Sequence, residues 1–390
     1  MKTGWQTKQL GDLCEVIAGQ SPEGKFYNAE GKGMPFYQGK KDFGEKFIEA
    51  PTTWTTQTTK VAKEGDILMS VRAPVGPVNF ATDEICIGRG LAAIRSRAAL
   101  NRDFLFYQLW HLQPEIAGRE GAVFASINKA EIAALPLAFA PLPEQQRIVG
   151  ILDEAFDGIA TAKSNAEKNL QNARALFESY LQSVFTQRGE GFEETTLGKV
   201  CEFVGGSQPP KAVFEKNQTA DNIRLIQIRD YKSDKHIVYI PRSMAKRFCD
   251  ADDVMIGRYG PPLFQILRGL SGAYNVALMK AVPNETKLSR DYLFYFLKHS
   301  DILQYVIYHS ERAAGQIGVT KETLEPYPIA LPSHEDQKRV VATIMELESE
   351  TQRLESIYRQ KLAALDDLKK SLLHQAFSGQ LTQRSVEEAA

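Results

Sequence analysis

The stretch LGDLCEVIAGQSP at residues 10–22 returns as LGKVCEFVGGSQP at residues 197–209, 187 positions further along the chain. Two more strings return in the same order: LNRDFLFYQL at 100–109 as LSRDYLFYFL at 288–297, and EQQRIV at 144–149 as DQKRVV at 336–341. This period is far longer than the repeats of solenoid proteins. The chain therefore contains two tandem copies of one unit, which predicts two similar binding sites.

The composition is that of an ordinary globular protein. The 390 residues are 43% hydrophobic, which is enough to bury two or more cores. No run approaches the roughly 20 apolar residues of a membrane span, and the start MKTGWQTKQL lacks the apolar core of a signal peptide. We expect a cytoplasmic protein that ends in a flexible tail at residues 382–390.

The sequence offers no pattern for a catalytic or metal site. Its four cysteines form no C-x-x-C pair, and its six histidines have no second ligand at metal spacing. Cys14 and Cys201 are equivalent in the repeat, which favours one buried packing position used twice. The string GPPLF at 260–264 lacks the Asn or Asp that an amino-methyltransferase loop needs, and G-x-x-x-x-G-K-[ST] is absent. We expect a non-catalytic chain with no cofactor of its own.

The charge is nearly balanced. The net charge is −1; residues 1–143 and 188–334 carry +1 and +2, whereas 144–187 and 335–390 carry −2 each. DNA-binding domains usually carry a strongly basic patch. Because phosphate contacts by Lys and Arg supply most non-specific affinity, we expect such a chain to bind DNA only together with a partner.

Each copy predicts a mixed α/β domain, over 1–143 and 188–334. In the first, GDILMSV (65–71) and GLAAIRS (90–96) are short apolar runs bounded by Gly- and Pro-rich turns, as in strands, and RDFLFYQLWHL (102–112) has helical spacing. The second copy repeats this order with RLIQIRDY, DDVMIGRYG and RDYLFYFLKH.

A long spacer helix is predicted after each domain, over 144–187 and 335–381. Prolines in the domain exits are expected to delay these helices until Glu144 and Glu335. Apolar residues then recur at coiled-coil spacing over about 40 residues. These are Ile148, Leu152, Ala155, Ile159, Ala162, Ala166, Ala173, Phe177 and Val184, and then Ile344, Leu347, Thr351, Leu354, Tyr358, Leu365, Leu368 and Leu372.

Antiparallel packing of the second helix on the first covers both seams within one molecule. The predicted fold class is therefore α+β, with two tandem mixed α/β domains separated by an antiparallel coiled coil in a pseudo-two-fold dumbbell. At 1.5 Å per residue, about 40 residues span roughly 60 Å, while one turn of B-DNA spans roughly 34 Å. The helices could thus set the distance between two DNA sites.

These strings together resemble the specificity subunit of type I restriction-modification enzymes. Each copy opens on an L-G-x-x-C-E-like strand and a G-x-S-P or G-S-x-P loop, contains a GDILMSVR-like strand, and exits through PLPEQQRIV or its variant. The helix ends LQSVFTQ (181–187) and LHQAFSGQLT (373–382) also match the usual finish of that family. The resemblance covers nearly the whole chain.

The resemblance implies a DNA reader without catalysis. Its expected partners are double-stranded DNA, two copies of an adenine N6-methyltransferase subunit, and an ATP-driven endonuclease subunit. S-adenosylmethionine would bind the methyltransferase, and ATP with Mg²⁺ the endonuclease. Each domain would read one half of a split, asymmetric target. The order of Ser and Gln in AGQSP (18–22) against GGSQP (205–209) suggests that the two halves differ.

Polar loop residues are the candidates for DNA contact, because Arg and Lys pair with guanine, Asn and Gln with adenine, and Lys, Arg and Ser with phosphate. The candidates are Gln20, Ser21, Lys25, Gln38, Lys40, Lys41, Arg72 and Arg89 in the first domain, and Ser207, Gln208, Lys211, Gln227, Arg229, Tyr231, Arg258, Tyr259 and Arg268 in the second. Gln38 and Gln227 are expected to correspond. The alternative for Arg72 and Arg258 is a salt bridge with a nearby acid such as Asp66 or Asp253.

The proline-rich exits are the candidates for docking the methyltransferase, because they join domain to spacer and occur twice. The residues are Phe139, Glu144, Arg147, Ile329, Asp336 and Arg339. Three other interpretations stay open. The chain could be a divergent enzyme, a coiled-coil scaffold with two protein-binding domains, or the specificity subunit of a methylation-only or other phage-defence system.

Overall fold

The computed structural model describes residues 4–117, 126–187, 189, 191–311 and 318–382. The chain forms two compact units, Met1–Ala166 with Gln360–Ala390, and Glu167–Arg359. These are called unit 1 and unit 2. Apart from Thr382, the predicted tail lies outside the described residues. Within the described ranges, no helix is long and apolar enough to cross a membrane.

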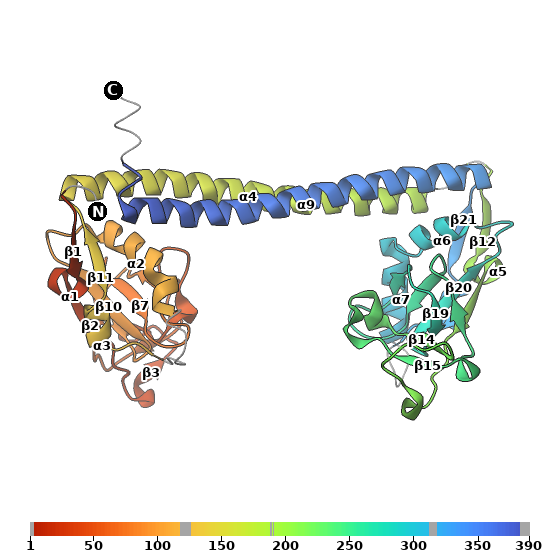
Figure 1. The fold of residues 1–390 in the computed structure, drawn as a ribbon, viewed down its shortest axis with the longest axis horizontal. Helices are drawn as coiled ribbons and strands as arrows, with labels where there is room; N and C mark the ends of the chain where they lie inside the picture. The colour runs from red at the N-terminus through yellow and green to blue at the C-terminus, as the bar shows by residue number, and fades with distance from the viewer. Residues whose placement is uncertain (1–3, 118–125, 188, 190, 312–317, 383–390) are drawn as a thin grey trace, which may run out of the picture. The chain divides into compact units, whose positions relative to one another are not determined.

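Unit 1 contains two sheets and a separate strand pair (Figure 1). The first sheet, antiparallel throughout, has the order β2 (Cys14–Ala18), β10 (Leu91–Ser96), β7 (Ile67–Ser70), β8 (Val78–Phe80). The second has the order β3 (Tyr27–Asn28), β5 (Trp54–Thr55), β4 (Met34–Tyr37), β9 (Ile85–Ile87), β6 (Val61–Ala62), with β4 and β9 parallel. The pair is β1 (Gln6–Gln9) with β11 (Pro136–Phe139), and the short helices are α1 (Leu10–Leu13), α2 (Arg102–Ala117) and α3 (Lys129–Ala133).

Unit 2 repeats this topology, except that its second sheet has four strands where that of unit 1 has five. Its first sheet has the order β13 (Cys201–Gly205), β20 (Leu278–Pro283), β17 (Val254–Gly257), β18 (Gln265–Leu267), and its second β15 (Tyr239–Pro241), β14 (Asn222–Ile226), β19 (Gly272–Tyr274), β16 (Phe248–Cys249). The pair is β12 (Glu193–Thr196) with β21 (Pro328–Leu331), and the short helices are α5 (Leu197–Val200), α6 (Arg290–Phe296), α7 (Ser300–Glu311) and α8 (Lys321–Leu324). The predicted internal repeat is thus a repeat of structure.

The predicted apolar runs GDILMSV and DDVMIGRYG form β7 and β17, which lie inside the first sheet of each unit and bury their side chains there. Every residue of β7 and of β17 is buried, as expected for a continuous apolar run of strand length. RDFLFYQLWHL forms the first part of α2, and RDYLFYF forms α6. Both helices pack their aromatic residues into the core of their own unit.

The two spacer helices are α4 (Leu142–Thr186) and α9 (His334–Ser378). They begin one or two residues before the predicted starts, and Pro143 lies in the first turn of α4. A proline is tolerated there because the first N–H groups of a helix have no partner within it. In unit 1, the first part of α4 runs antiparallel to the last part of α9, and the Lys163 ammonium pairs with the Asp366 carboxylate. In unit 2, Arg174 Nε lies 2.7 Å from Glu355 Oε1.

The predicted seam is wrong at one position of α9. Leu368 is 46% exposed, whereas the Lys369 ammonium lies 4.0 Å from the ring centroid of Trp110 and 5.0 Å from that of Phe156. A cation over an aromatic face is stabilising when partly desolvated, and the Lys stem adds apolar contact. Contact with aromatic side chains of the domain therefore determines that Lys369, and not Leu368, faces inward. A heptad pattern within the helix contains no information about that contact.

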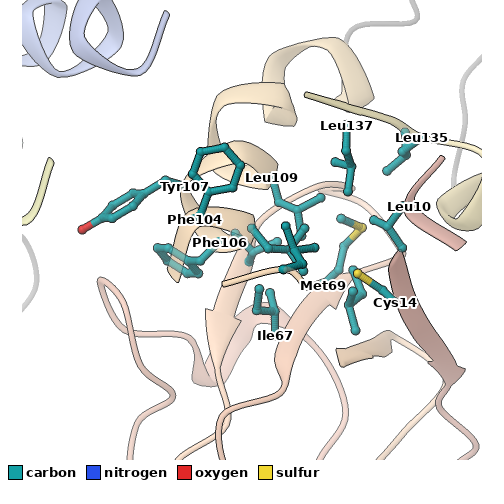
Figure 2. Close-up of a cluster of buried hydrophobic side chains, with 14 of the residues drawn as sticks. Leu10, Cys14, Ile67, Met69, Phe104, Phe106, Tyr107, Leu109, Leu135 and Leu137 are labelled. Carbon is teal, nitrogen blue, oxygen red and sulfur yellow. The ribbon is translucent and has the colours of Figure 1, made fainter. Parts of the chain in front are cut away.

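Cys14 and Cys201 occupy the same buried place in the two units, as predicted. They are 2% and 5% exposed, and burial raises the pKa of each thiol to about 12. Figure 2 shows Cys14 beside Leu10, Met69 and other apolar side chains of unit 1. Thiols of this kind remain protonated and pack as small apolar groups.

The C-terminal end of α9 completes the core of unit 1. Leu373 and Ala376 are 5% and 0% exposed within that core, and the Phe377 ring lies 5.3 Å from the ring of Phe104. In unit 2 the C-terminal end of α4 fills the equivalent place with Leu181 and Phe185. The matching helix ends of the sequence therefore complete two equivalent cores. The end that does so in each unit is called its plug.

His299 predicts a pH dependence of stability. It is 3% exposed, and burial lowers its pKa. An unfolded histidine has a pKa near 6.5. Below about pH 6.5, His299 therefore binds a proton in the unfolded chain more readily than in the folded chain. Stability should therefore fall with falling pH, by at most about 1.4 kcal/mol per pH unit for one histidine.

The measurement is the urea midpoint of the full chain between pH 8 and pH 5.5. His299→Gln should flatten the decline, whereas His236→Gln, at an exposed position, should leave it as in the wild type. Equal slopes for wild type and His299→Gln would contradict the assignment.

Candidate nucleic-acid interface

Predicted site residues of unit 1 converge at the turn between β9 and β10. The loop after β2 reaches this turn, where Gln20 N donates to Ile87 O at 2.9 Å. Arg89, within the turn, donates its backbone N–H to Ser21 Oγ at 3.2 Å. The loop and the turn are thus joined, and they present Gln20 and Arg89 as exposed side chains.

Two more candidates reach the same turn from other strands. Gln38 directly follows β4, and a methyl group placed on Gly88 would lie 3.1 Å from the Gln38 side chain. Arg72 follows Val71, whose N–H donates to Gly90 O at 2.9 Å. The structure therefore gathers amide, hydroxyl and guanidinium groups from four separate segments at one end of the sheets.

The three predicted lysines of unit 1 lie on exposed 3-10 turns, within four residues of Ser21 or Gln38 in the sequence. Lys25 lies 2.6 Å from the Glu23 carboxylate, and Lys41 lies 3.8 Å from Asp42. Lys40 is exposed two residues after Gln38. Surface ion pairs of this kind contribute little to stability, so these lysines can exchange their partners for phosphates at low cost.

The turn between β19 and β20 of unit 2 is held by the same backbone hydrogen bonds. In unit 1, Gln20 N donates to Ile87 O, Gly88 N to Tyr37 O, and Val71 N to Gly90 O. In unit 2 the equivalent bonds run from Ser207 N to Tyr274 O, from Asn275 N to Ile226 O, and from Arg258 N to Ala277 O. A Cβ on Gly19 would lie 2.2 Å from the Gly88 carbonyl oxygen, and one on Gly206 would lie 1.9 Å from the Asn275 oxygen. The shared glycine of the loop is required by this close approach.

In each unit, the backbone of the loop and the turn that these hydrogen bonds join is called the frame. Equivalent positions of the two frames carry different side chains. The pairs are Gln20 and Ser207, Ser21 and Gln208, Arg72 and Tyr259, and Arg89 and Val276. Gln38 and Gln227 directly follow the equivalent strands β4 and β14, so their predicted correspondence is confirmed. The backbone is therefore repeated, while most of the polar groups on it are not.

Four candidates of unit 2 line one groove of about 650 Å³. Gln208, Lys211, Gln227 and Arg229 supply its polar groups, and Pro209, Pro210 and Phe214 supply its apolar wall. Sequence reasoning missed this wall, although the string QPPK at 208–211 was a visible difference between the copies. The groove combines amide donors and acceptors, two cations and an aromatic face.

Tyr231, which was predicted to contact DNA, and its neighbour Asp230, which was not, are both mainly structural. Tyr231 packs against the second core of unit 2, and burial raises the pKa of its hydroxyl. Asp230 is 4% exposed, accepts a hydrogen bond from Gln227 N at 2.9 Å, and has a pKa raised by burial. Asp230 therefore orients the Gln227 backbone at the edge of the groove.

Arg258 and Arg268 are held by the protein itself. Arg258 Nε donates to Val319 O at 2.9 Å and Nη1 donates to Val276 O at 3.3 Å. Arg268 Nη1 lies 2.7 Å from Asp291 on α6, and its guanidinium lies 4.1 Å from the ring centroid of Phe294. These contacts reduce the capacity of both residues to bind phosphate.

Asp66 and Asp253, the acids named in the salt-bridge alternative for Arg72 and Arg258, pair with other cations among the described residues. Arg95 binds Asp66 at 2.7 Å, and Lys280 binds Asp253 at 3.0 Å. Tyr259, the remaining candidate, lies beside Arg258, whose guanidinium is 5.2 Å from the Tyr259 ring centroid.

One predicted docking residue must be corrected. Ile329 is 2% exposed in β21, because that strand packs its apolar face into the core of unit 2. It cannot contact a partner in this structure. Phe139 is half-buried in β11, with the Lys8 ammonium 4.2 Å from its ring centroid.

The other docking candidates lie on the first turns of the spacer helices. Glu144 accepts a hydrogen bond from the Thr382 hydroxyl within unit 1. Arg147 and Arg339 are exposed at equivalent positions of α4 and α9, and Arg339 pairs with Asp336. Arg147 and Arg339 thus place a positive charge at equivalent points of the two junctions between domain and spacer.

One buried glutamine in each unit fastens the domain to the spacer helix that follows it. Gln145 Nε2 donates to the carbonyls of Ala99 and Ala140 at 3.2 and 2.7 Å, and its Oε1 accepts from Asn101 N at 2.7 Å. Gln337 does the same in unit 2, with the Lys287 and Pro332 carbonyls and Ser289 N. Both side chains are 0% exposed. The repeated EQQR and DQKR strings were visible, but their role was not.

We expect Gln337→Leu to destabilise unit 2 by about 2–3 kcal/mol, because it leaves one buried N–H and two buried carbonyls without partners. Hydrogen exchange resolved by peptide would locate the loss in unit 2. Lys338→Leu changes the exposed neighbour and should have little effect. Equal protection in Gln337→Leu and Lys338→Leu would refute the fastening role.

Comparison with known proteins identifies the family. The family model described as "Type I restriction modification DNA specificity domain" matches residues 2–171 and again 189–362. The "Putative type I restriction enzyme MjaX specificity subunit" of Methanocaldococcus jannaschii is 39% identical over 174 residues, which are 44% of this chain and 40% of that protein. The MjaIX specificity subunit of the same organism is 22% identical over 284 residues, 60% of this chain and 65% of that protein. The chain thus spans less than two thirds of both relatives.

Solved structures show the same fold along almost the whole chain. A chain from a study of complex assembly and conformational transition of the type I R-M system has a TM-score of 0.80 at 20% identity, covering 98% of this chain and 99% of that one. The HsdS subunit from Thermoanaerobacter tengcongensis has a TM-score of 0.63 at 20% identity, covering 98% of each chain. Specificity subunits of type I systems are non-catalytic. With one matching domain in each copy of its repeat, the chain belongs to the family of type I restriction-modification DNA specificity subunits.

Proposed function

We propose that each unit reads one half of a bipartite, asymmetric DNA target. The observation that carries this proposal is the pair of equivalent turns, β9–β10 and β19–β20, which share their backbone bonds and differ in their polar side chains. A shared frame suits two sites that engage the same duplex geometry. Unlike side chains on that frame suit two different base sequences.

The chemistry of each turn fits base edges. In unit 1, the exposed Arg72 and Arg89 offer paired donors of the kind that bind guanine O6 and N7, and Gln38 offers the donor and acceptor that suit adenine. In unit 2, Gln208 and Gln227 supply amides along the groove, while Lys211 and Arg229 supply cations suited to phosphate.

The nearly neutral charge points to a complex. The two domains carry only +1 and +2 by sequence, so phosphate contacts by this chain alone would give weak binding. We propose that two methyltransferase subunits dock at the equivalent junctions marked by Arg147 and Arg339, that endonuclease subunits join them, and that α4 and α9 set the gap. S-adenosylmethionine, ATP and Mg²⁺ would bind those partners.

DNA binding by the reconstituted complex at several salt concentrations tests this proposal. We expect the chain with its methyltransferase to prefer its target over random DNA, with an affinity that falls as salt rises. The methyltransferase without the chain should show no preference. A complex that forms but gains no sequence preference from the chain would favour the scaffold interpretation.

A further inference from the structure

We propose that Arg89 and Val276 are equivalent specificity-determining residues, with Arg89 selecting a guanine in one half of the target and Val276 selecting a thymine in the other. This inference rests on the proposed function, because it names the contact by which each unit distinguishes its half-site. It concerns one position on each turn, and one base in each half of the target.

The equivalence follows from the bonds on both sides of each residue. Before Arg89, Gly88 N donates to Tyr37 O at 2.8 Å; before Val276, Asn275 N donates to Ile226 O at 3.1 Å. The residues after them, Gly90 and Ala277, each accept from the strand alongside, at 2.9 Å in both units. Each residue is therefore held between the same two fixed points.

Arg89 has a fixed backbone and a free side chain. Its N–H is bound by Ser21 Oγ at 3.2 Å, while its side chain is exposed and forms no ion pair with any described residue. A guanidinium carries its charge at all relevant pH values and presents paired donors. Two N–H donors match the O6 and N7 acceptors that guanine alone displays together in the major groove.

Val276 presents an apolar side chain at the same point. It is 40% exposed, although its backbone is well fixed. Its carbonyl accepts from Arg258 Nη1 at 3.3 Å, and the preceding Asn275 Oδ1 accepts from Ala277 N at 3.2 Å. Because valine can neither donate nor accept, it can distinguish bases only by apolar contact. The C5 methyl of thymine is the apolar group of the major groove.

The equivalence of the two turns also accounts for the role of Arg258. Its position on the frame is that of Val71 in unit 1, and its guanidinium bonds the Val276 carbonyl and the Val319 carbonyl. In unit 2 an arginine therefore binds the backbone of the turn, while the side chain of Val276 is exposed. In unit 1 the exposed position itself carries the arginine. This contrast predicts that Arg258 is a positioning residue, whereas Arg89 contacts a base.

The test uses the full chain in complex with its methyltransferase subunit. DNA duplexes in which each position of the target is varied in turn compete for the complex, and the relative affinity for each base is measured. The variants are Arg89→Val and Val276→Arg. Arg97→Val and Val282→Arg are matched controls, because these exposed residues follow or lie near the far ends of β10 and β20. Size-exclusion chromatography checks that every variant forms the complex.

Arg89→Val should lower the preference for guanine roughly tenfold to a hundredfold at a single position in one half. Val276→Arg should change the preferred base at a single position of the other half from thymine toward guanine. The two controls should keep the wild-type preferences. Those outcomes together support the assignment of both residues.

A wild-type complex that selects a split target, with both variants unchanged, overturns this inference and leaves the proposed function intact. Variants that alter the same half, or that weaken all sequences equally, also overturn it, because they indicate general or structural contacts. A wild-type complex that selects no split target overturns the proposed function first, and the inference with it.

Discussion

A chain that ends at Arg359 should lose the fold of unit 1 and keep that of unit 2. The removed segment carries Leu373, which is 5% exposed, and Phe377, which packs against Phe104. Replacing one buried leucine by alanine typically costs about 2–5 kcal/mol, and a domain is typically stable by about 5–15 kcal/mol. Loss of the whole plug therefore removes most of the stability of unit 1.

Hydrogen exchange resolved by peptide measures this effect. Peptides of β2, β7 and β10 should lose protection, whereas those of β13, β17 and β20 should keep it. A chain ending at Thr382 retains the plug and is the control. Phe185→Ala, in the equivalent plug of unit 2, should produce the opposite pattern. Full protection of β7 in the chain that ends at Arg359 would show that unit 1 does not depend on the plug.

Removing one heptad from each spacer helix should shorten the gap of the DNA target and leave its two halves unchanged. The deletions are residues 164–170 and 359–365, which keep Lys163 opposite Asp366 and Arg174 opposite Glu355. Seven residues shorten a helix by about 10 Å, equivalent to about three base pairs of B-DNA. We expect a gap shorter by about one to three base pairs, because the domains must also follow the turn of the duplex.

The target of the deletion variant is read by mapping N6-methyladenine in DNA methylated by the complex. A variant that replaces residues 164–170 and 359–365 with other helix-forming heptads keeps the length and is the control. Altered half-sites with an unaltered gap would contradict the role of the helices as spacers.

The fold could be predicted from the sequence because its main signals are local or repeated. GDILMSV shows the continuous apolar run of a buried strand, and RDFLFYQLWHL shows the spacing of a helix. The repeat of EQQR as DQKR links each domain to a helix. The inward position of Lys369 could not be predicted in this way. It depends on Trp110 and Phe156, and sequence spacing within α9 contains no information about them.

The candidate site was predicted in part for the same reason. Gln38 and Gln227 were found because both follow an apolar strand at equivalent points of the repeat. Val276 was missed because the strings IGRGLA (87–92) and YNVALM (274–279) share only one leucine. Their common frame is defined by backbone bonds to distant strands. Ile329 was misjudged because an apolar residue in an exit segment suits a partner surface and a core equally well, and only the fold shows it to be buried.

In the proposed function, this chain supplies the sequence specificity of a complex, and each unit reads one half of the target. The most direct measurement is to co-express the chain with its methyltransferase subunit in a host without N6-adenine methylation, and to map N6-methyladenine by single-molecule sequencing. We expect a split motif with two unlike halves and a constant gap, absent when the chain is omitted. The same methylation without the chain, or a motif with identical halves, would contradict it.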